Sequence, residues 1–242
     1  MERVTPRMDG LRTDGGGGDG DERIEGPHQG TEPAHAGAPP EEARVGVVLL
    51  HGRGATARGI LDLAREIAVD GVAYLAPGAS HNTWYPQSFL APVSANEPGR
   101  SSGLQAISDA VDRLTGAGVP EERVVLGGFS QGACLATEFA ARNPRRYGGV
   151  FALSGGVIGE TVDVEEYAAG REGTMDGTPV FLGCSDVDPH IPVERVHDTR
   201  EVFEALGADV TERIYEGMGH TVNVDELEHV RGIVEGAADG SD

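Results

Sequence analysis

The segment GFSQG at 128–132 is the part of the chain whose residue types and spacing point most directly to chemistry. It places Ser130 between two glycines, after an apolar run at 124–126 and before a helical pattern at 131–142. A serine at such a sharp strand-to-helix turn presents its Oγ at the carboxyl end of the strand, and the glycines let the backbone close without Cβ clashes. The pattern therefore predicts that Ser130 is the nucleophile of an acyl-transfer reaction, against the alternative of a structural glycine-rich turn.

A serine nucleophile needs a general base. Where the serine stands at a strand-to-helix turn of this kind, the acid follows the serine in the sequence and the base follows the acid. His220 fits this order, because it ends the glycine-bearing segment GMGH at 217–220, after the last predicted strand. Other histidines fit less well: His51 precedes the serine, and His197 and His229 fall within helical patterns and are expected to face solvent. We therefore predict that His220 removes the serine proton.

The acid that orients this histidine should follow the preceding strand, where the sequence is DVDPHIP at 186–192. Asp188 is our choice, because Pro189 biases it toward an extended conformation that can project the carboxylate, and Asp186 is the second choice. A metal site is an alternative, since Asp186, Asp188 and His190 alternate along this segment like ligands. Three such residues in a turn are common by chance, so we predict no metal and no cofactor.

Backbone N–H groups that point at the reacting carbonyl oxygen must stabilise the oxyanion of an acyl-transfer intermediate. One should come from Gln131, which follows the nucleophile, and another from the loop HGRG at 51–54, where Arg53 is best placed. The alternative for this loop is a plain glycine-rich turn. Trp84 and Phe89, in a later loop, are candidates for the wall of the acyl pocket, although loop aromatics are as often packing anchors.

Short apolar runs alternate with helical patterns along most of the chain. Strands that alternate with helices form βαβ units, so we predict an α/β fold with a mostly parallel central sheet and helices on both faces. The expected strands span 45–50, 72–76, 124–126, 150–153, 178–182 and 210–215, and the expected helices 60–68, 104–114, 131–142, 192–206 and 222–234.

The predicted folded domain covers residues 44–236. Residues 1–43 predict a disordered, acidic and Gly-rich tail, because they carry too little apolar surface to offset the entropy of ordering, and His28 and His35 are then tail residues. Residues 237–242 predict a flexible C-terminal tail. The charged stretch at 158–176 is expected to be a surface insertion near the mouth of the site.

The charge of the chain is strongly negative and excludes several partners. Nineteen basic residues, all of them Arg, stand against 40 acidic ones, which gives a formal net charge of -21. Nucleic acids and anionic membranes need basic surface, and no apolar run approaches the length of a membrane span, so we expect neither partner. High salt screens the self-repulsion, so the acidic, Lys-free composition is typical of the cytosol of a salt-loving archaeon, whereas codon bias alone leaves the acid excess unexplained. We expect a cytoplasmic protein in which Cys134 and Cys184 are buried small apolar residues.

Five motifs in this order resemble the phospholipase/carboxylesterase family of the α/β-hydrolase superfamily, which includes acyl-protein thioesterases. They are LHGRG at 50–54, TWYP at 83–86, GFSQG at 128–132, DPHIP at 188–192 and GH at 219–220. The resemblance covers about residues 44–235 and implies an α/β-hydrolase fold and cofactor-free hydrolysis of a small-molecule ester or thioester. It also implies a Ser130–His220–Asp188 triad, favours Asp188 over Asp186, and assigns the oxyanion N–H groups to Arg53 and Gln131.

Two features depart from the usual family pattern. Cys184-Ser185 stands where the family often has His-Gly before the acid, and Arg53 stands where an apolar residue is frequent, so its side chain either favours an anionic substrate or points to solvent. A lactonase similar to dienelactone hydrolase is the main alternative enzyme, but that family usually carries Cys at the position of Ser130. A non-catalytic binding module with this fold is the alternative from another class, although such modules usually lose a triad member. Monomer and homodimer both stay open.

Overall fold

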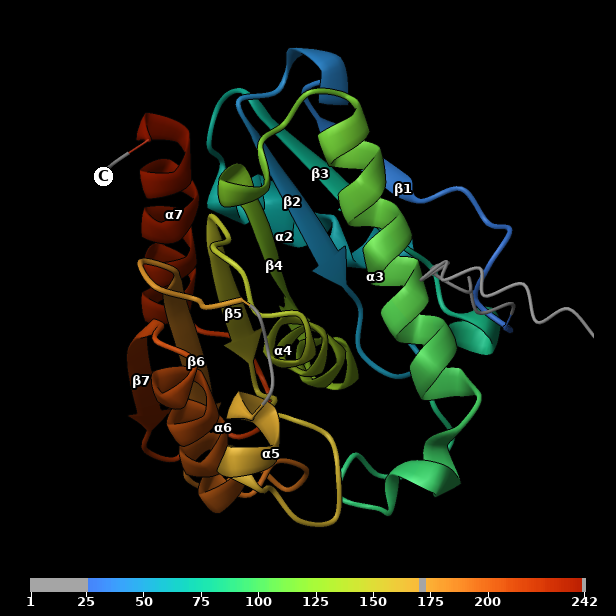
Figure 1. Ribbon diagram of the computed structural model, residues 1–242, viewed down its shortest axis with the longest axis vertical. Helices are drawn as coiled ribbons and strands as arrows, with labels where there is room; N and C mark the ends of the chain where they lie inside the picture. The colour runs from blue at the N-terminus through green and yellow to red at the C-terminus, as the bar shows by residue number, and fades with distance from the viewer. Residues whose placement is uncertain (1–25, 170–172, 241–242) are drawn as a thin grey trace, which may run out of the picture.

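A computed structural model of the chain describes residues 26–169 and 173–240. Its centre is a seven-stranded sheet in the order β1-β3-β2-β4-β5-β6-β7, with β1 antiparallel to β3 and every other pair parallel (Figure 1). The predicted mostly parallel α/β fold is therefore confirmed.

The strands are β1 (Ala34–Gly37), β2 (Val45–Leu50), β3 (Val72–Ala76), β4 (Val124–Phe129), β5 (Gly149–Leu153), β6 (Pro179–Ser185) and β7 (Asp209–Tyr215). The α-helices are α1 (Ala57–Ile60), α2 (Asp62–Ile67), α3 (Gly99–Gly116), α4 (Gln131–Arg142), α5 (Val164–Ala168), α6 (Val193–Ala205) and α7 (Val224–Asp239). Among the described residues, no helix is both long and apolar enough to cross a membrane.

The inner strands are apolar because helices cover the sheet on both faces. β2 and β5 are buried at every position, whereas the edge strand β7 alternates between exposed and half-buried residues. The sheet separates two apolar clusters. One contains Ile107 of α3, Leu135 of α4 and Val202 of α6, and the other contains Ile67 of α2 and Val234 of α7. Helices on both faces leave the carboxyl ends of the parallel strands as the open edge, where the loops of a site can gather.

The N-terminal boundary predicted at residue 44 is wrong. Residues 34–37 form β1, which pairs with β3, and the buried His28 contacts the molecule through both ring nitrogens. Its Nδ1 accepts the Ser80 N–H (3.0 Å), so its Nε2 donates to the Trp84 carbonyl oxygen (2.8 Å). The folded domain thus includes residues 26–43, because a strand partner distant in sequence supplies what local composition lacks. Residues 1–25 of the predicted tail lie outside the described residues.

The C-terminal boundary and the predicted insertion also need correction. α7 continues to Asp239, so Ala237 and Ala238 are helical and buried, not part of a flexible tail, while residues 241–242 lie outside the described residues. The stretch at 158–176 is more than a surface insertion, since Tyr167 of α5 and Met175 are buried in the core. Residues 170–172 of this stretch lie outside the described part of the chain.

Candidate active site

Ser130 occupies a strained turn between β4 and α4. Its backbone has φ 56° and ψ -122°, which non-glycine residues rarely adopt, and its N–H donates to the Leu153 carbonyl oxygen of β5 (2.9 Å). Glycine is required at the two flanking positions, because a side chain would not fit there. A Cβ at Gly128 would lie 2.3 Å from the Leu50 carbonyl oxygen, and one at Gly132 would lie 2.2 Å from the same atom. The turn therefore has the steric basis that the sequence pattern predicted.

His220 lies between Ser130 and Asp188 and contacts both. Its Nε2 is 2.9 Å from Ser130 Oγ, and its Nδ1 is 2.7 Å from Asp188 Oδ2. Because a carboxylate can only accept, Nδ1 carries the proton, which leaves Nε2 free to accept the serine proton. The rings of Phe129 and His190, each with its centroid 4.8 Å away, flank the imidazole. The structure thus brings together the three side chains selected from the sequence.

Asp188 is held as an ionised acceptor. Its side chain is fully buried, and its Oδ1 accepts the backbone N–H groups of His190 (2.8 Å) and Ile191 (3.1 Å). Burial alone would raise the pKa of Asp188, but the hydrogen bonds from His220 and from these backbone groups outweigh it and lower the pKa below its ordinary value. A carboxylate in this state can orient His220 and stabilise its charged form.

Two hydrogen bonds join the end of β6 and the loop after it to the loop after β7. We call these the acid loop (residues 186–192) and the His220 loop (residues 216–223). Asp186 Oδ1 accepts the Gly217 N–H (2.7 Å), and Ser185 Oγ accepts the Gly219 N–H (3.0 Å). The second choice for the acid therefore ties the two loops and does not contact the histidine. The Cys184-Ser185 departure contributes one of these ties.

The alternative of a metal site has no ligand group to support it. In residues 26–169 and 173–240, no three His, Cys, Asp or Glu side chains are arranged to hold a metal ion. The carboxylates of Asp186 and Asp188 bond to the His220 loop instead, and the backbone N–H of His190 donates to Asp188.

Both cysteines are free and buried, as predicted. Burial raises the pKa of each thiol to about 12, so neither is a thiolate at neutral pH. Cys134 lies on the first turn of α4, where its N–H donates to the Ser130 carbonyl oxygen (3.0 Å). Cys184 is fully buried beside Asp188, and its thiol donates to Asp188 Oδ2 (3.9 Å).

The backbone N–H groups of Arg53 and Gln131 are both available for an oxyanion. Gln131 is the first residue of α4, so its N–H has no partner within the helix, and in the described part of the chain neither N–H donates to a protein acceptor. The two side chains have another task. The side-chain amide of Gln131 accepts the backbone N–H of Trp84 (2.9 Å) and donates to the Tyr85 carbonyl oxygen (2.9 Å). The exposed Arg53 guanidinium donates to the carbonyl oxygens of residues 85–87. The Arg53 side chain thus holds a pocket loop and is not free in solvent.

His51 supports the oxyanion loop, a role that the sequence analysis missed. Its Nε2 accepts the Ala79 N–H (3.1 Å), so its Nδ1 carries the proton and donates to the Gly52 carbonyl oxygen (2.8 Å). Burial lowers the pKa of His51 and favours this neutral form. The Gly52 carbonyl and the Arg53 N–H belong to one planar peptide unit, so this bond also fixes the direction of the N–H. The position of His51 inside the LHGRG motif was the available signal.

A cavity of about 460 Å³ opens beside Ser130 and His220. Its wall also includes Arg53, Tyr85, Phe89, Cys134, His190 and Ile191. Phe89 therefore lies where the sequence analysis expected an acyl-pocket residue. Trp84 does not line this cavity, because it is fully buried beneath the loop and its indole N–H donates to the His51 carbonyl oxygen (2.9 Å). The substrate contact assigned to Trp84 is corrected to a packing role.

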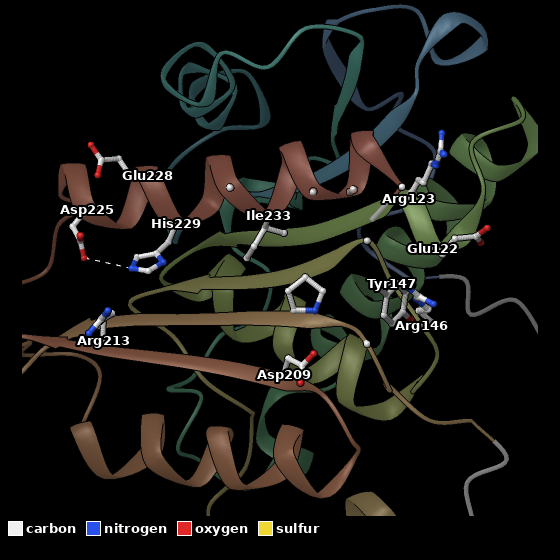
Figure 2. Close-up of a pocket in the computed structure, with 17 residues that line it drawn as sticks. Glu122, Arg123, Arg146, Tyr147, Asp209, Arg213, Asp225, Glu228, His229 and Ile233 are labelled. Atoms are coloured by element: carbon white, nitrogen blue, oxygen red, sulfur yellow. Dashed lines mark ion pairs between the residues drawn. The ribbon is translucent and has the colours of Figure 1, made fainter. Parts of the chain in front are cut away.

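A larger cavity of about 1020 Å³ lies between α7 and the β6–β7 side of the sheet (Figure 2). Acidic and basic side chains both line it, and Figure 2 shows Arg123 and Arg146 at one end and His229 at the other, with His229 Nε2 3.7 Å from the Asp225 carboxylate. His229 was expected to face solvent, but its ring stacks on that of Phe181, with the two ring centroids 4.6 Å apart. The serine–histidine–aspartate series is absent from this lining, so the smaller cavity is the candidate active site.

The chain is similar in sequence and in structure to known phospholipases/carboxylesterases and acyl-protein thioesterases. Residues 34–235 match the model of the Phospholipase/Carboxylesterase family. The structure is similar to a crystal structure of a phospholipase/carboxylesterase from Dyadobacter fermentans, with a TM-score of 0.80 and 38% identity over 85% of this chain and 97% of that chain. Acyl-protein thioesterase 1 of Saccharomyces cerevisiae is 25% identical over 81% of this chain and 93% of its own length. The match to acyl-protein thioesterase 1 of Kluyveromyces lactis is 34% identical over 54% of this chain and spans 57% of that protein.

Proposed function

The chain belongs to the phospholipase/carboxylesterase family of α/β hydrolases, as its motifs predict, and on this premise we propose that it hydrolyses carboxylic esters or thioesters with Ser130 as nucleophile. The observation that carries the proposal is the hydrogen-bonded series from Ser130 through His220 to Asp188, with distances of 2.9 Å and 2.7 Å. A nucleophile, a base and an orienting acid at these distances are what acyl transfer through a covalent intermediate needs.

In the proposed mechanism, His220 Nε2 takes the Ser130 proton as Oγ attacks the carbonyl carbon of the substrate. The oxyanion accepts hydrogen bonds from the Arg53 and Gln131 N–H groups, at the positively polarised N-terminus of α4. Collapse of this intermediate expels an alcohol or thiol, which takes the proton from His220, and leaves the acyl group on Ser130. Water then gives a proton to His220 and attacks the acyl-enzyme carbonyl, and His220 passes that proton to Ser130 Oγ as the carboxylic acid leaves, which restores the serine. Asp188 stays ionised throughout.

The cavity volume and wall support a small-molecule acyl substrate. About 460 Å³ lies in the lower half of the range of roughly 300–1,000 Å³ that small-molecule sites occupy. Phe89 and Ile191 supply the apolar surface for an acyl chain. A thioester is as well supported as an oxygen ester, because both give the same acyl-enzyme and several relatives are named acyl-protein thioesterases. Serine at position 130 argues against a dienelactone-hydrolase-like lactonase.

Hydrolysis of 4-nitrophenyl esters and matched thioesters of graded acyl length tests the proposal. Ser130→Ala should lower kcat by about 10⁴-fold or more and should abolish labelling by a fluorophosphonate, which reacts with an activated serine. Ser94→Ala is the matched control, because Ser94 is exposed and outside the cavity wall, and it should keep both activities. Full hydrolysis or full labelling in Ser130→Ala would refute the assignment of the nucleophile.

The remaining expectations from composition also belong to the proposal. A net charge of -21 supports work in a cytoplasm of high salt concentration, where self-repulsion is screened. A homodimer and a monomer are both compatible with a site built within one chain. The dependence of activity on salt concentration tests the salt adaptation, and light scattering of the purified protein measures its oligomeric state.

A further inference from the structure

Glu226 is a fully buried carboxyl group next to the loop that carries His220. It is the third residue of α7 and forms a capping box with Asn223. The Glu226 N–H donates to Asn223 Oδ1 (2.9 Å), and the Asn223 N–H donates to Glu226 Oε2 (2.8 Å). Because Asn223 is the last residue of the His220 loop, this pair fixes the point where the loop ends and α7 begins.

The second carboxyl oxygen of Glu226 faces β6 without a polar partner. Among the described residues, Oε1 is buried and accepts or donates no hydrogen bond. It lies so close to the strand that a Cβ at Gly183 would come within 2.4 Å of it. Two residues further along β6, Ser185 Oγ holds the Gly219 N–H of the His220 loop (3.0 Å). The carboxyl group is therefore wedged between the strand that leads into the acid loop and the helix that follows the His220 loop.

The described residues include no ion-pair partner for Glu226. The charged and titratable groups around it are Cys184 on β6, Tyr215 and the exposed Arg213 on β7, which stands opposite Gly183, and Asp225 on α7. The Tyr215 hydroxyl donates to Asp225 (2.7 Å) and not to Glu226. Burial raises the pKa of Glu226 to about 7, with the Asn223 N–H opposing the shift and the charge of Asp225 adding to it. An ionised Glu226 would be a buried anion beside another anion, which is strongly unfavourable.

We propose that Glu226 is a positioning residue that acts as the neutral acid and sets the His220 loop against Ser130. This inference rests on the proposed role of His220 as general base. While the proton is in place, the carboxyl group stays buried and holds the Asn223 N–H, so the loop keeps its geometry. When hydroxide takes that proton, the products are water and a carboxylate that needs hydration. The start of α7 must then move away from β6, and this movement carries His220 away from Ser130 Oγ.

The pH dependence of ester hydrolysis by the full chain tests this role. In the wild type, kcat should fall by about tenfold per pH unit once the pH exceeds about 7, as Glu226 ionises. Glu226→Gln keeps the capping box but cannot ionise, so the alkaline fall should disappear. Asp225→Asn should move the fall to lower pH, because loss of that negative charge lowers the pKa of Glu226. Glu228→Gln, at an exposed position two residues further along α7, is the control and should keep the wild-type profile.

The outcomes separate this inference from the proposed function. A wild-type kcat that stays level between about pH 7 and pH 9, or the same alkaline fall in Glu226→Gln, would overturn the positioning role. Absence of hydrolysis at every pH would instead refute the proposed function. Circular dichroism at each pH establishes that the chain is folded. Should Glu226→Gln not fold, infrared titration of the wild type decides: a protonated-carboxyl band at about pH 6 that is lost by about pH 8 supports the inference, and its absence at pH 6 overturns it.

Discussion

Replacement of Glu138 by Gln removes a buried charge that four neighbouring groups share. Glu138 lies in α4 with no exposed side-chain surface, and its Oε1 pairs with Arg100 of α3 and with Arg142 one turn further along α4. Its Oε2 accepts the Tyr167 hydroxyl (2.8 Å) and the Ile158 N–H (3.0 Å). The cluster therefore joins α3, α4 and the segment around α5, and every part of it depends on the carboxylate.

The magnitude follows from the burial of the partners. In Glu138→Gln the side chain keeps its size, but Arg100, which is 8% exposed, loses its closest carboxylate and keeps the longer contact with the partly exposed Glu97 (3.3 Å). Breaking a buried pair in this way costs about 3–5 kcal/mol. Arg142 is 31% exposed and can turn toward water, which favours the lower part of this range. For a domain of this size, the loss corresponds to a fall in Tm of roughly 6–20 °C.

Glu121→Gln is the matched control, since Glu121 pairs with Arg145 at 2.7 Å while both side chains are more than a third exposed. A surface pair of this kind contributes about 0–1 kcal/mol. Urea unfolding followed by circular dichroism, at one salt concentration for all three proteins, gives the two free energies of unfolding. Similar losses in both variants would refute the argument that burial makes the Glu138 cluster the stronger one.

The loss of folding stability at low pH tests the prediction for Glu138 independently. Burial alone would raise the pKa of Glu138, but the charges of Arg142 and Arg100 outweigh it and hold the pKa below its usual value of 4.5. Because the folded-state pKa is depressed, the stabilisation is present above the unfolded-state value and is lost as the pH falls through the folded-state value. Below about pH 4.5, the wild type should therefore lose stability more steeply than Glu138→Gln.

Four further predictions concern the site and the charge of the chain. Gly132→Ala should lose most of its esterase activity toward the same substrate, because the added Cβ would meet the Leu50 carbonyl oxygen at 2.2 Å. Full kcat in the purified variant would contradict this steric argument. Asp188→Asn should lower kcat by roughly 10⁴-fold with little change in KM, because an amide does not hold His220 in the tautomer with a free Nε2, and steady-state kinetics decide this. His51→Ala should lower kcat by about 10–100-fold while fluorophosphonate labelling persists, since one oxyanion donor loses its orientation; equal loss of labelling would indicate general unfolding. Raising KCl from about 0.1 M to about 1 M, which shortens the Debye length from about 10 Å to about 3 Å, should raise the Tm of a chain with a net charge of -21, and a salt-independent Tm would count against salt adaptation.

Much of the fold and the centre of the candidate site could be predicted from the sequence, because the relevant physics is local. β2, β3 and α4 have the predicted bounds, since apolar runs and helical periodicity reflect the burial of neighbouring residues. The turn at Ser130 follows from the absence of Cβ atoms at Gly128 and Gly132, which is written in the residue types themselves. Chain order then sufficed to select His220.

Only the tertiary structure decided which residues far apart in the chain meet. β1 exists because Ala34 pairs with Ala76 of β3, a contact that local composition does not reveal. Trp84 and Phe89 come from one loop, yet one is buried beneath it and the other lines the cavity, because loop direction depends on Gln131 and on other residues outside the loop. The same reason applies to Glu226 of α7. A capping pattern in the sequence shows where this helix begins. Only the packing of α7 on β6 removes the carboxyl group from water and so makes its proton part of the site.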